Sequence, residues 1–254
     1  MSRPTPGDGT VAVVPRWPGQ TLALLRRELV AYFLSPMSYL VWGVFLVAAG
    51  YLFATSLRDG GSASMAATFS HIGLLLVFVC PLLTMHLVAE EQKMGTLEVL
   101  MSDPVGEAAV ICGKFAAAYV FLMIMLLPTT CYPLILYAAG KPDLGPVLAG
   151  YIGLAVLGAL FVSVGLLASA STSSQIAAAA LSFTILLLFW ALSRAARAAS
   201  PGTLQDALSY LSAFSRFNDF RRGLVDTRSI MYCFSLAWLS LFLATRLVGM
   251  RRLR

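Results

Sequence analysis

The sequence predicts an all-α membrane protein with six transmembrane helices, and three observations support this fold class. Of the 254 residues, 59% are apolar and only 12% are charged, whereas soluble proteins average about 25% charged residues. The mean hydropathy is +0.81. Six apolar runs are long enough to cross a ~30 Å hydrocarbon layer as helices, and every Asp, Glu, Lys and Arg except Arg246 lies outside these runs. We therefore expect most of the chain to lie in the lipid bilayer rather than in water.

Residues 1–20 predict a flexible cytoplasmic tail. They contain four prolines and three glycines without apolar periodicity. A secretory signal would place its apolar core within the first ~30 residues, but the first long apolar run begins only near Pro36. We therefore expect the first span to be retained in the mature protein.

Residues 21–34 predict an N-terminal amphipathic helix lying at the membrane interface. Arg26, Arg27 and Glu28 occupy other positions of the helical wheel, and Ser35-Pro36 ends the helix. The alternative is that this segment forms the wetted end of one long first span. The apolar side chains recur at helical spacing: Leu22, Leu25, Leu29 and Phe33.

Residues 21–254 are expected to form a single transmembrane domain. The longest connection, residues 193–228, is too short to enclose a core of its own. Thr203 and Asp206 nevertheless resemble a helix cap, and a stripe that includes Phe214 predicts a short helix at the membrane surface, followed by a turn. The six spans are expected at residues 36–57, 69–89, 115–139, 147–170, 175–192 and 229–248.

Basic residues give only a weak orientation signal. Six spans place both termini on one side of the membrane, but lysine and arginine divide almost evenly between the two sides. The charges around the first span favour cytoplasmic termini. The net charge of +6 is scattered over segment ends, which favours contact with anionic lipid over nucleic acid.

The polar residues within the spans do not form a catalytic or metal site. His71 and His86 are expected on one helix about 22 Å apart, too far to share a metal, so a role in polar packing is favoured over haem ligation. The sequence contains no G-x-S-x-G motif. Gly113-Lys114 lacks the other residues of a Walker A loop, so this chain is not expected to hydrolyse ATP. The cysteines have no paired spacing and are expected to be packing residues: Cys80, Cys112, Cys131 and Cys233.

Small residues and prolines within the spans predict close packing and kinks. Gly165 and Ser169 are spaced for close helix contact, either within the chain or at a dimer seam. The same alternatives apply to Ala155, Ala159 and Ser163. Kinks are expected where proline interrupts a span, at Pro81, Pro128 and Pro133.

The connection over residues 90–114 is unusual for a loop beside anionic lipid, because it holds five carboxylates and two lysines. Gly95 permits a turn, Thr96 can cap a helix and Pro104 can end it. An apolar face on a helix this short needs a partner's groove to bury it, and Glu91 and Glu98 would pair with charges at its rim. The apolar face consists of Leu97, Leu100 and Met101.

The pattern E-E-x-x-x-G-T-L-E-x-L-x-x-x-P, followed by G-K-F, resembles the cytoplasmic coupling segment of ABC-2 type transporter permeases. The amphipathic helix that ends in SPMSYL resembles the family's connecting helix before its first span, and SRFNDFRRGLVDTR resembles the stretch before the last span in gliding-motility-type permeases. Asp103 departs from the pattern, because a small or apolar residue is commoner before this proline. The matching positions are Glu90, Glu91, Gly95, Thr96, Leu97, Glu98, Leu100, Pro104, Gly113 and Lys114.

The resemblance implies an exporter subunit in the cell inner membrane with both termini cytoplasmic. Two such permeases, identical or related, would pair, and each would seat its coupling helix in a cleft of a separate ABC ATPase subunit. ATP and magnesium would bind that partner, and no cofactor would bind this chain. The expected contacts with the ATPase are Glu91, Gly95, Thr96, Leu97, Glu98, Leu100, Met101 and Pro104.

By the same resemblance, residues 193–228 would form short extracytoplasmic helices that close the exit path. The arginines of this stretch are expected to be solvated or to contact head groups rather than substrate phosphate. The substrate is not identified, and a membrane scaffold that holds a cytoplasmic partner without transport is the alternative function. The candidate gate residues are Phe214, Phe217, Phe220 and Arg221.

Overall fold

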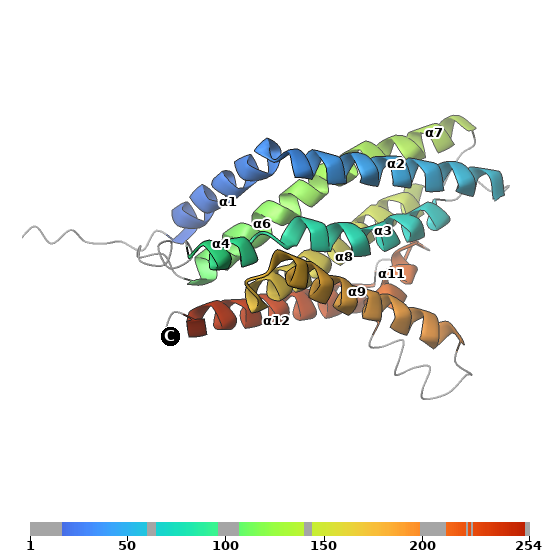
Figure 1. Ribbon diagram of the computed structural model, residues 1–254. Coiled ribbons are helices and arrows are strands. Elements are labelled where there is room, and N and C mark those ends of the chain that lie inside the picture. Colours follow the sequence, from blue (N-terminus) through green and yellow to red (C-terminus); the bar gives the residue numbers. More distant parts are fainter. Residues whose placement is uncertain are drawn as a thin grey trace, which may run out of the picture.

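The computed structural model describes residues 17–59, 65–95, 107–139, 144–198, 212–221, 223–224 and 226–251, and every regular element within these ranges is helical (Figure 1). The predicted all-α class is therefore confirmed. The elements are α1 (Trp17–Leu34), α2 (Pro36–Asp59), α3 (Ala66–Thr84), α4 (Ala89–Met94), α6 (Glu107–Leu126), the 3₁₀ helix η1 (Leu127–Thr130), α7 (Cys131–Ala139), α8 (Leu144–Ser171), α9 (Gln175–Ala198), α11 (Ala213–Arg221) and α12 (Thr227–Arg251).

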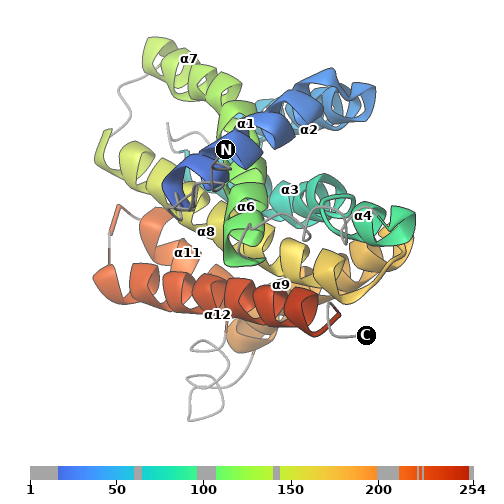
Figure 2. The ribbon, with the colours of Figure 1, turned by 90° about the vertical axis from the view of Figure 1, so that its left-hand side faces the viewer.

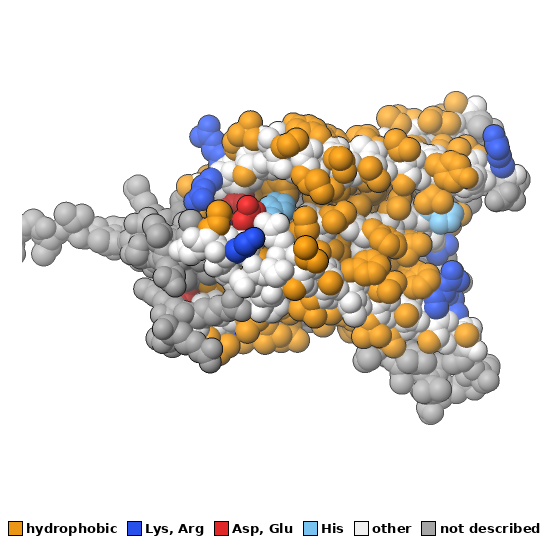
Figure 3. All heavy atoms as spheres, viewed as in Figure 1, with side chains coloured by type: hydrophobic (Ala, Val, Ile, Leu, Met, Phe, Trp, Pro, Cys, Tyr) orange, Lys and Arg blue, Asp and Glu red, His pale blue; other side chains and the backbone are white. Residues whose placement is uncertain are grey.

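Six helical stretches of the described chain are long and apolar enough to cross a membrane, which confirms the six predicted spans. Figure 3 shows a mainly hydrophobic face whose arginines and lysines gather toward its two ends. The third stretch begins two turns earlier than predicted, and the fifth ends later. The stretches are Pro36–Arg58, Ala66–Met94, Glu107–Ala138, Leu144–Ser171, Gln175–Ala198 and Thr227–Met250.

The N-terminal helix α1 is separate from α2, as the proline rule predicts. It begins at Trp17, so the prediction of a tail through residue 20 is wrong at its end, because proline fits the first turn of a helix. Leu22 and Phe33 of the predicted apolar stripe are exposed, whereas Leu24 and Tyr32 are buried. The protein-facing side of α1 therefore differs from the stripe, and it packs along α6 (Figure 2).

Helix α8 is the packing axis of the bundle, because it contacts α3, α6, α9, α11 and α12. Its glycines allow neighbouring side chains to approach its backbone. A Cβ on Gly165 would overlap the side chain of Thr84, and a Cβ on Gly150 would overlap the ring of Phe69. The small residue at Gly165 therefore serves packing within the chain, which is one of the two predicted alternatives.

Of the three prolines at which a kink is predicted, Pro128 changes the helix most. At Pro128 the third span changes from α6 to the 3₁₀ helix η1 and then to α7. The Thr129 hydroxyl donates to the Leu126 carbonyl at 2.6 Å, and the Tyr151 hydroxyl of α8 donates to the Thr129 carbonyl at 2.8 Å. These bonds give two backbone carbonyls of the irregular turn side-chain donors within the protein. At Pro81, by contrast, α3 continues to Thr84.

The substitution Gly165→Ala is expected to destabilise the bundle by about 1–3 kcal/mol, because overpacking forces neighbours to move. Thr84 is fully buried, and its hydroxyl donates to the Cys80 carbonyl at 2.9 Å, so its side chain has little freedom to shift. The matched control is Gly43→Ala, where a Cβ meets no atom within 4 Å and removal of a helical glycine should be neutral or stabilising. Thermal unfolding in detergent measures both, and equal midpoints would contradict the packing role of Gly165.

Candidate functional site

Helix α4 forms the start of the predicted coupling segment, residues 90–114, at one end of the bundle. The backbone of Gly95 has φ +70° and caps the helix, a left-handed conformation that favours glycine. Glu91 and Gly95 are therefore the members of the predicted ATPase contact that the structure places. The others lie outside the described residues, and their role stays a prediction: Thr96, Leu97, Glu98, Leu100, Met101 and Pro104.

The turn before α4 is fastened to the end of α8 by a serine. The hydroxyl of Ser169 accepts hydrogen bonds from the backbone N–H groups of Val88 and Ala89, each at 3.1 Å, and donates to the Met85 carbonyl at 3.1 Å. The Gln92 amide donates to the Ala170 carbonyl at 3.0 Å. The first N–H groups of α4 are thus capped from another helix rather than by a local side chain.

A buried lysine joins three helices at the same end of the bundle. Lys114 of α6 is 1% exposed, and its Nζ lies 3.0 Å from Oε1 of Glu28 on α1 and 2.8 Å from Oε1 of Glu91 on α4. Both carboxylates are themselves mostly buried. We call these three residues the Lys114 cluster. The sequence predicts Lys114 at the end of a loop, whereas α6 begins at Glu107 and buries the lysine in the bundle.

The Lys114 cluster specifies helix positions more than it adds stability. Removing an ammonium group from water costs several kcal/mol, and the two carboxylates offset this cost only while all three helices keep their positions. The charged hydrogen bonds are short and directional. A shift of α4 therefore requires α1 and α6 to move with it, or the cluster to break.

Tyr32 supports the cluster from α1. Its hydroxyl donates to the Leu83 carbonyl of α3 at 2.7 Å, and its ring stacks on Phe121 with centroids 4.9 Å apart. Burial raises the pKa of the Tyr32 hydroxyl well above its ordinary value, and the nearby Glu28 carboxylate raises it further. Because the phenol therefore stays protonated at physiological pH, it remains a hydrogen-bond donor that holds α1 against α3.

The candidate gate residues lie at the opposite end, on α11. Phe214, Phe217 and Phe220 are buried, and a Cβ on Gly73 or Gly153 would meet their rings. The guanidinium of Arg221 donates to the Ala66 carbonyl at 2.7 Å. Helix α11 is a short helix before the last span, as the resemblance implies for residues 193–228. The helix that the apolar stripe predicts near residues 203–214 lies mostly outside the described residues. The structure thus places the four side chains together, whereas their gating role stays a prediction.

Neither the histidines nor the cysteines form a metal site within the described ranges. The prediction that His71 and His86 lie on one helix is wrong, because α3 ends at Thr84 and His86 lies in the following turn. The ring of His86 instead meets Tyr32 edge-on at 5.3 Å. The packing role predicted for all four cysteines holds for Cys80 and Cys233, whereas the other two are exposed.

The sequence pattern of the ABC-2 family transporter proteins matches residues 53–248, which is most of the chain. The chain belongs to this family. Members of the ABC-2 family are membrane permease subunits of ABC transporters, in agreement with the six candidate spans. The matched range includes Glu91 and Lys114 but not α1 with Glu28. No curated protein sequence matches the chain.

The substitution Lys114→Met is expected to destabilise this permease by about 3–5 kcal/mol, because it leaves two buried carboxylates without their counter-ion. Neutralising them in the triple variant Lys114→Met/Glu28→Gln/Glu91→Gln should recover a large part of that loss. Lys93→Met is the matched control, since Lys93 is an exposed lysine on α4. Thermal unfolding in detergent measures all three. A triple variant no more stable than Lys114→Met would contradict the charge-pairing account.

Proposed function

We propose that the protein is the permease subunit of an ATP-driven ABC-2 exporter in the cytoplasmic membrane. A separate ATPase subunit would bind ATP and magnesium, and a second permease, identical or related, would complete the pathway. The family match supports this proposal. SRFNDFRRGLVDTR, which spans much of α11 and the start of α12, supports placement in the gliding-motility-type subfamily.

The observation that carries the proposal is the position of α4 and α6. Residues 96–106, the middle of the predicted coupling segment at residues 90–114, connect these two helices, and both helices contribute to the Lys114 cluster. A force that an ATPase applies to this segment would therefore act on the bundle through both α4 and α6. The cluster would pass it to α1, and Ser169 would pass it to α8. Charge-assisted hydrogen bonds suit this transmission of movement, because their short, specific geometry makes the joined helices move together.

Helix α8 offers a route from this end to α11. It contacts α4 at one end and packs against α11 toward the other. Phe217 and Phe220 lie against Gly153 of α8, so a shift of α8 changes the space available to both rings. In this proposal, movement at the coupling segment opens or closes the exit through α11.

The double substitution Leu97→Asp/Leu100→Asp is expected to release the ATPase from the permease. Burying two leucine side chains contributes on the order of 3–5 kcal/mol, and a carboxylate in an apolar groove cannot replace it. The affinity-tagged protein would be purified from membranes of the cells that naturally produce it. The co-purified vanadate-sensitive ATPase activity should fall at least about tenfold.

The matched control for this experiment is Leu97→Met/Leu100→Met, which keeps the face apolar and should retain the activity. Both variants should insert into the membrane in equal amounts. Undiminished ATPase activity with the aspartate variant would count against a coupling role. Recovery of an ATPase without ATP-dependent solute or lipid movement in reconstituted vesicles would favour the scaffold function.

The orientation predicts which exposed positions a membrane-impermeant thiol reagent reaches. Ser212 beside α11 is fully buried, so Leu224 and Met94, which are exposed at opposite ends of the bundle, are the better probe sites. In a background that carries Cys112→Ser/Cys131→Ser, Leu224→Cys should label in intact cells. Met94→Cys should label only after permeabilisation. The reverse pattern would place the termini outside.

A further inference from the structure

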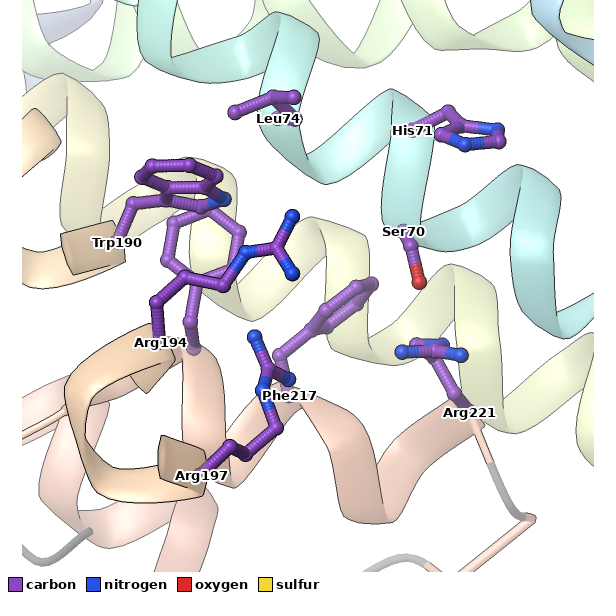
Figure 4. A pocket seen from close by; sticks show the side chains of 9 residues that line it. Ser70, His71, Leu74, Trp190, Arg194, Arg197, Phe217 and Arg221 are labelled. Atoms are coloured by element: carbon purple, nitrogen blue, oxygen red, sulfur yellow. The ribbon is translucent and has the colours of Figure 1, made fainter. Parts of the chain in front are cut away.

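A basic cavity opens at the end of the bundle opposite the Lys114 cluster. Its volume is about 240 Å³, and α3, α9 and α11 line it. Figure 4 shows Arg194 and Arg197 of α9 and Arg221 of α11 turning their guanidinium groups toward one space, which Ser70 of α3 also borders. Side chains that are distant in sequence therefore converge here.

The lining changes from apolar to basic along the bundle axis. Leu74 lies one turn deeper on α3 than Ser70, and Trp190 lies one turn deeper on α9 than Arg194. The Arg194 guanidinium lies 5.2 Å from the centroid of the Trp190 ring, a cation–π contact that links the two zones. A membrane lipid has the same gradient, with its phosphate outermost and its chains deeper.

The cavity lining is strongly basic within the described part of the chain. Three arginines line the cavity, and none of the described lining residues carries a carboxylate. Neither Arg194 nor Arg197 forms an ion pair there, and both are exposed. Like charges that line one cavity repel one another, and an anion between them would relieve the repulsion. Guanidinium groups match phosphate oxygens in pairs.

We propose that this cavity binds the phosphate group of an anionic phospholipid-like amphiphile. The phosphate lies among Arg194, Arg197 and Arg221, and the adjoining apolar chain lies along Trp190 and Leu74. The volume supports a head group rather than a whole ligand, since sites that enclose drug-sized molecules measure about 300–1,000 Å³. The chains therefore extend from the cavity into the surrounding hydrocarbon.

Quenching of tryptophan fluorescence by brominated lipid tests the proposal on the full chain in nanodiscs. Brominated phosphatidylglycerol is compared with brominated phosphatidylcholine, and the Trp190 signal is the difference between the protein and Trp190→Phe. With two arginines each contributing about 1 kcal/mol, phosphatidylglycerol should quench Trp190 with at least about fivefold higher apparent affinity. Trp238 is exposed on α12 and should respond to both lipids alike.

Two variants separate the cavity from general surface charge. Arg194→Gln/Arg197→Gln should abolish the preference of the Trp190 signal for phosphatidylglycerol. Arg228→Gln, which removes an exposed arginine near the start of α12 and outside the cavity lining, should retain it. Retained thermal unfolding midpoints show that both variants are folded. Equal quenching by the two lipids, or a preference that survives Arg194→Gln/Arg197→Gln, would overturn the proposal.

Inorganic phosphate distinguishes a lipid from a free anion as the source of the phosphate. If it is added to the protein in detergent, it should change the Trp190 signal only at concentrations far above those at which the lipid acts. Saturation by phosphate alone without any lipid preference would overturn the proposal in favour of a small-anion site. The binding experiment contains no ATPase and measures no transport, so its failure is distinguishable from failure of the proposed exporter function.

Discussion

The structure depends on one ammonium group held away from water. Lys114 is 1% exposed and has carboxylates from α1 and α4 at 3.0 and 2.8 Å, so three helices must keep their mutual positions for the charge to be compensated. The surrounding contacts reinforce the same arrangement. Tyr32 bonds α1 to α3, and Ser169 bonds the start of α4 to α8. The predicted coupling segment thus begins from helices whose positions are fixed relative to the bundle.

The two ends of the bundle handle charge in opposite ways. At the Lys114 cluster, buried charges of opposite sign compensate one another within the chain. At the cavity near α11, the described lining carries arginines without carboxylates and opens toward apolar side chains. The first arrangement suits a rigid mechanical connection, and the second suits an external anion. Helix α8 contacts elements at both ends, and its glycines let those elements pack directly against its backbone.

The prediction of the spans succeeded because crossing a ~30 Å hydrocarbon layer imposes length and apolarity on the sequence itself. The errors share another physical cause. Charged residues ordinarily mark the ends of spans, so the sequence predicts a loop over Glu107–Lys114, but a lysine can enter a helix when carboxylates from distant segments meet it. The sequence places His86 on the same helix as His71 because a turn between two helical stretches leaves no clear signal in an apolar sequence. The buried face of α1 was missed because it carries Leu24, Glu28 and Tyr32 rather than an uninterrupted apolar stripe.

The sequence by itself determined the solvent of the protein, the number of its spans and its resemblance to ABC-2 permeases, because these follow from local composition and from a spaced motif. It also marked Lys114 as part of that motif. Only the tertiary structure decided that Glu28 and Glu91 meet this lysine, that Ser169 caps α4, and that arginines of α9 and α11 share one cavity. Such contacts join residues 23 to 86 positions apart. Helical periodicity says which residues share a face of one helix, but the packing of helices decides which faces meet.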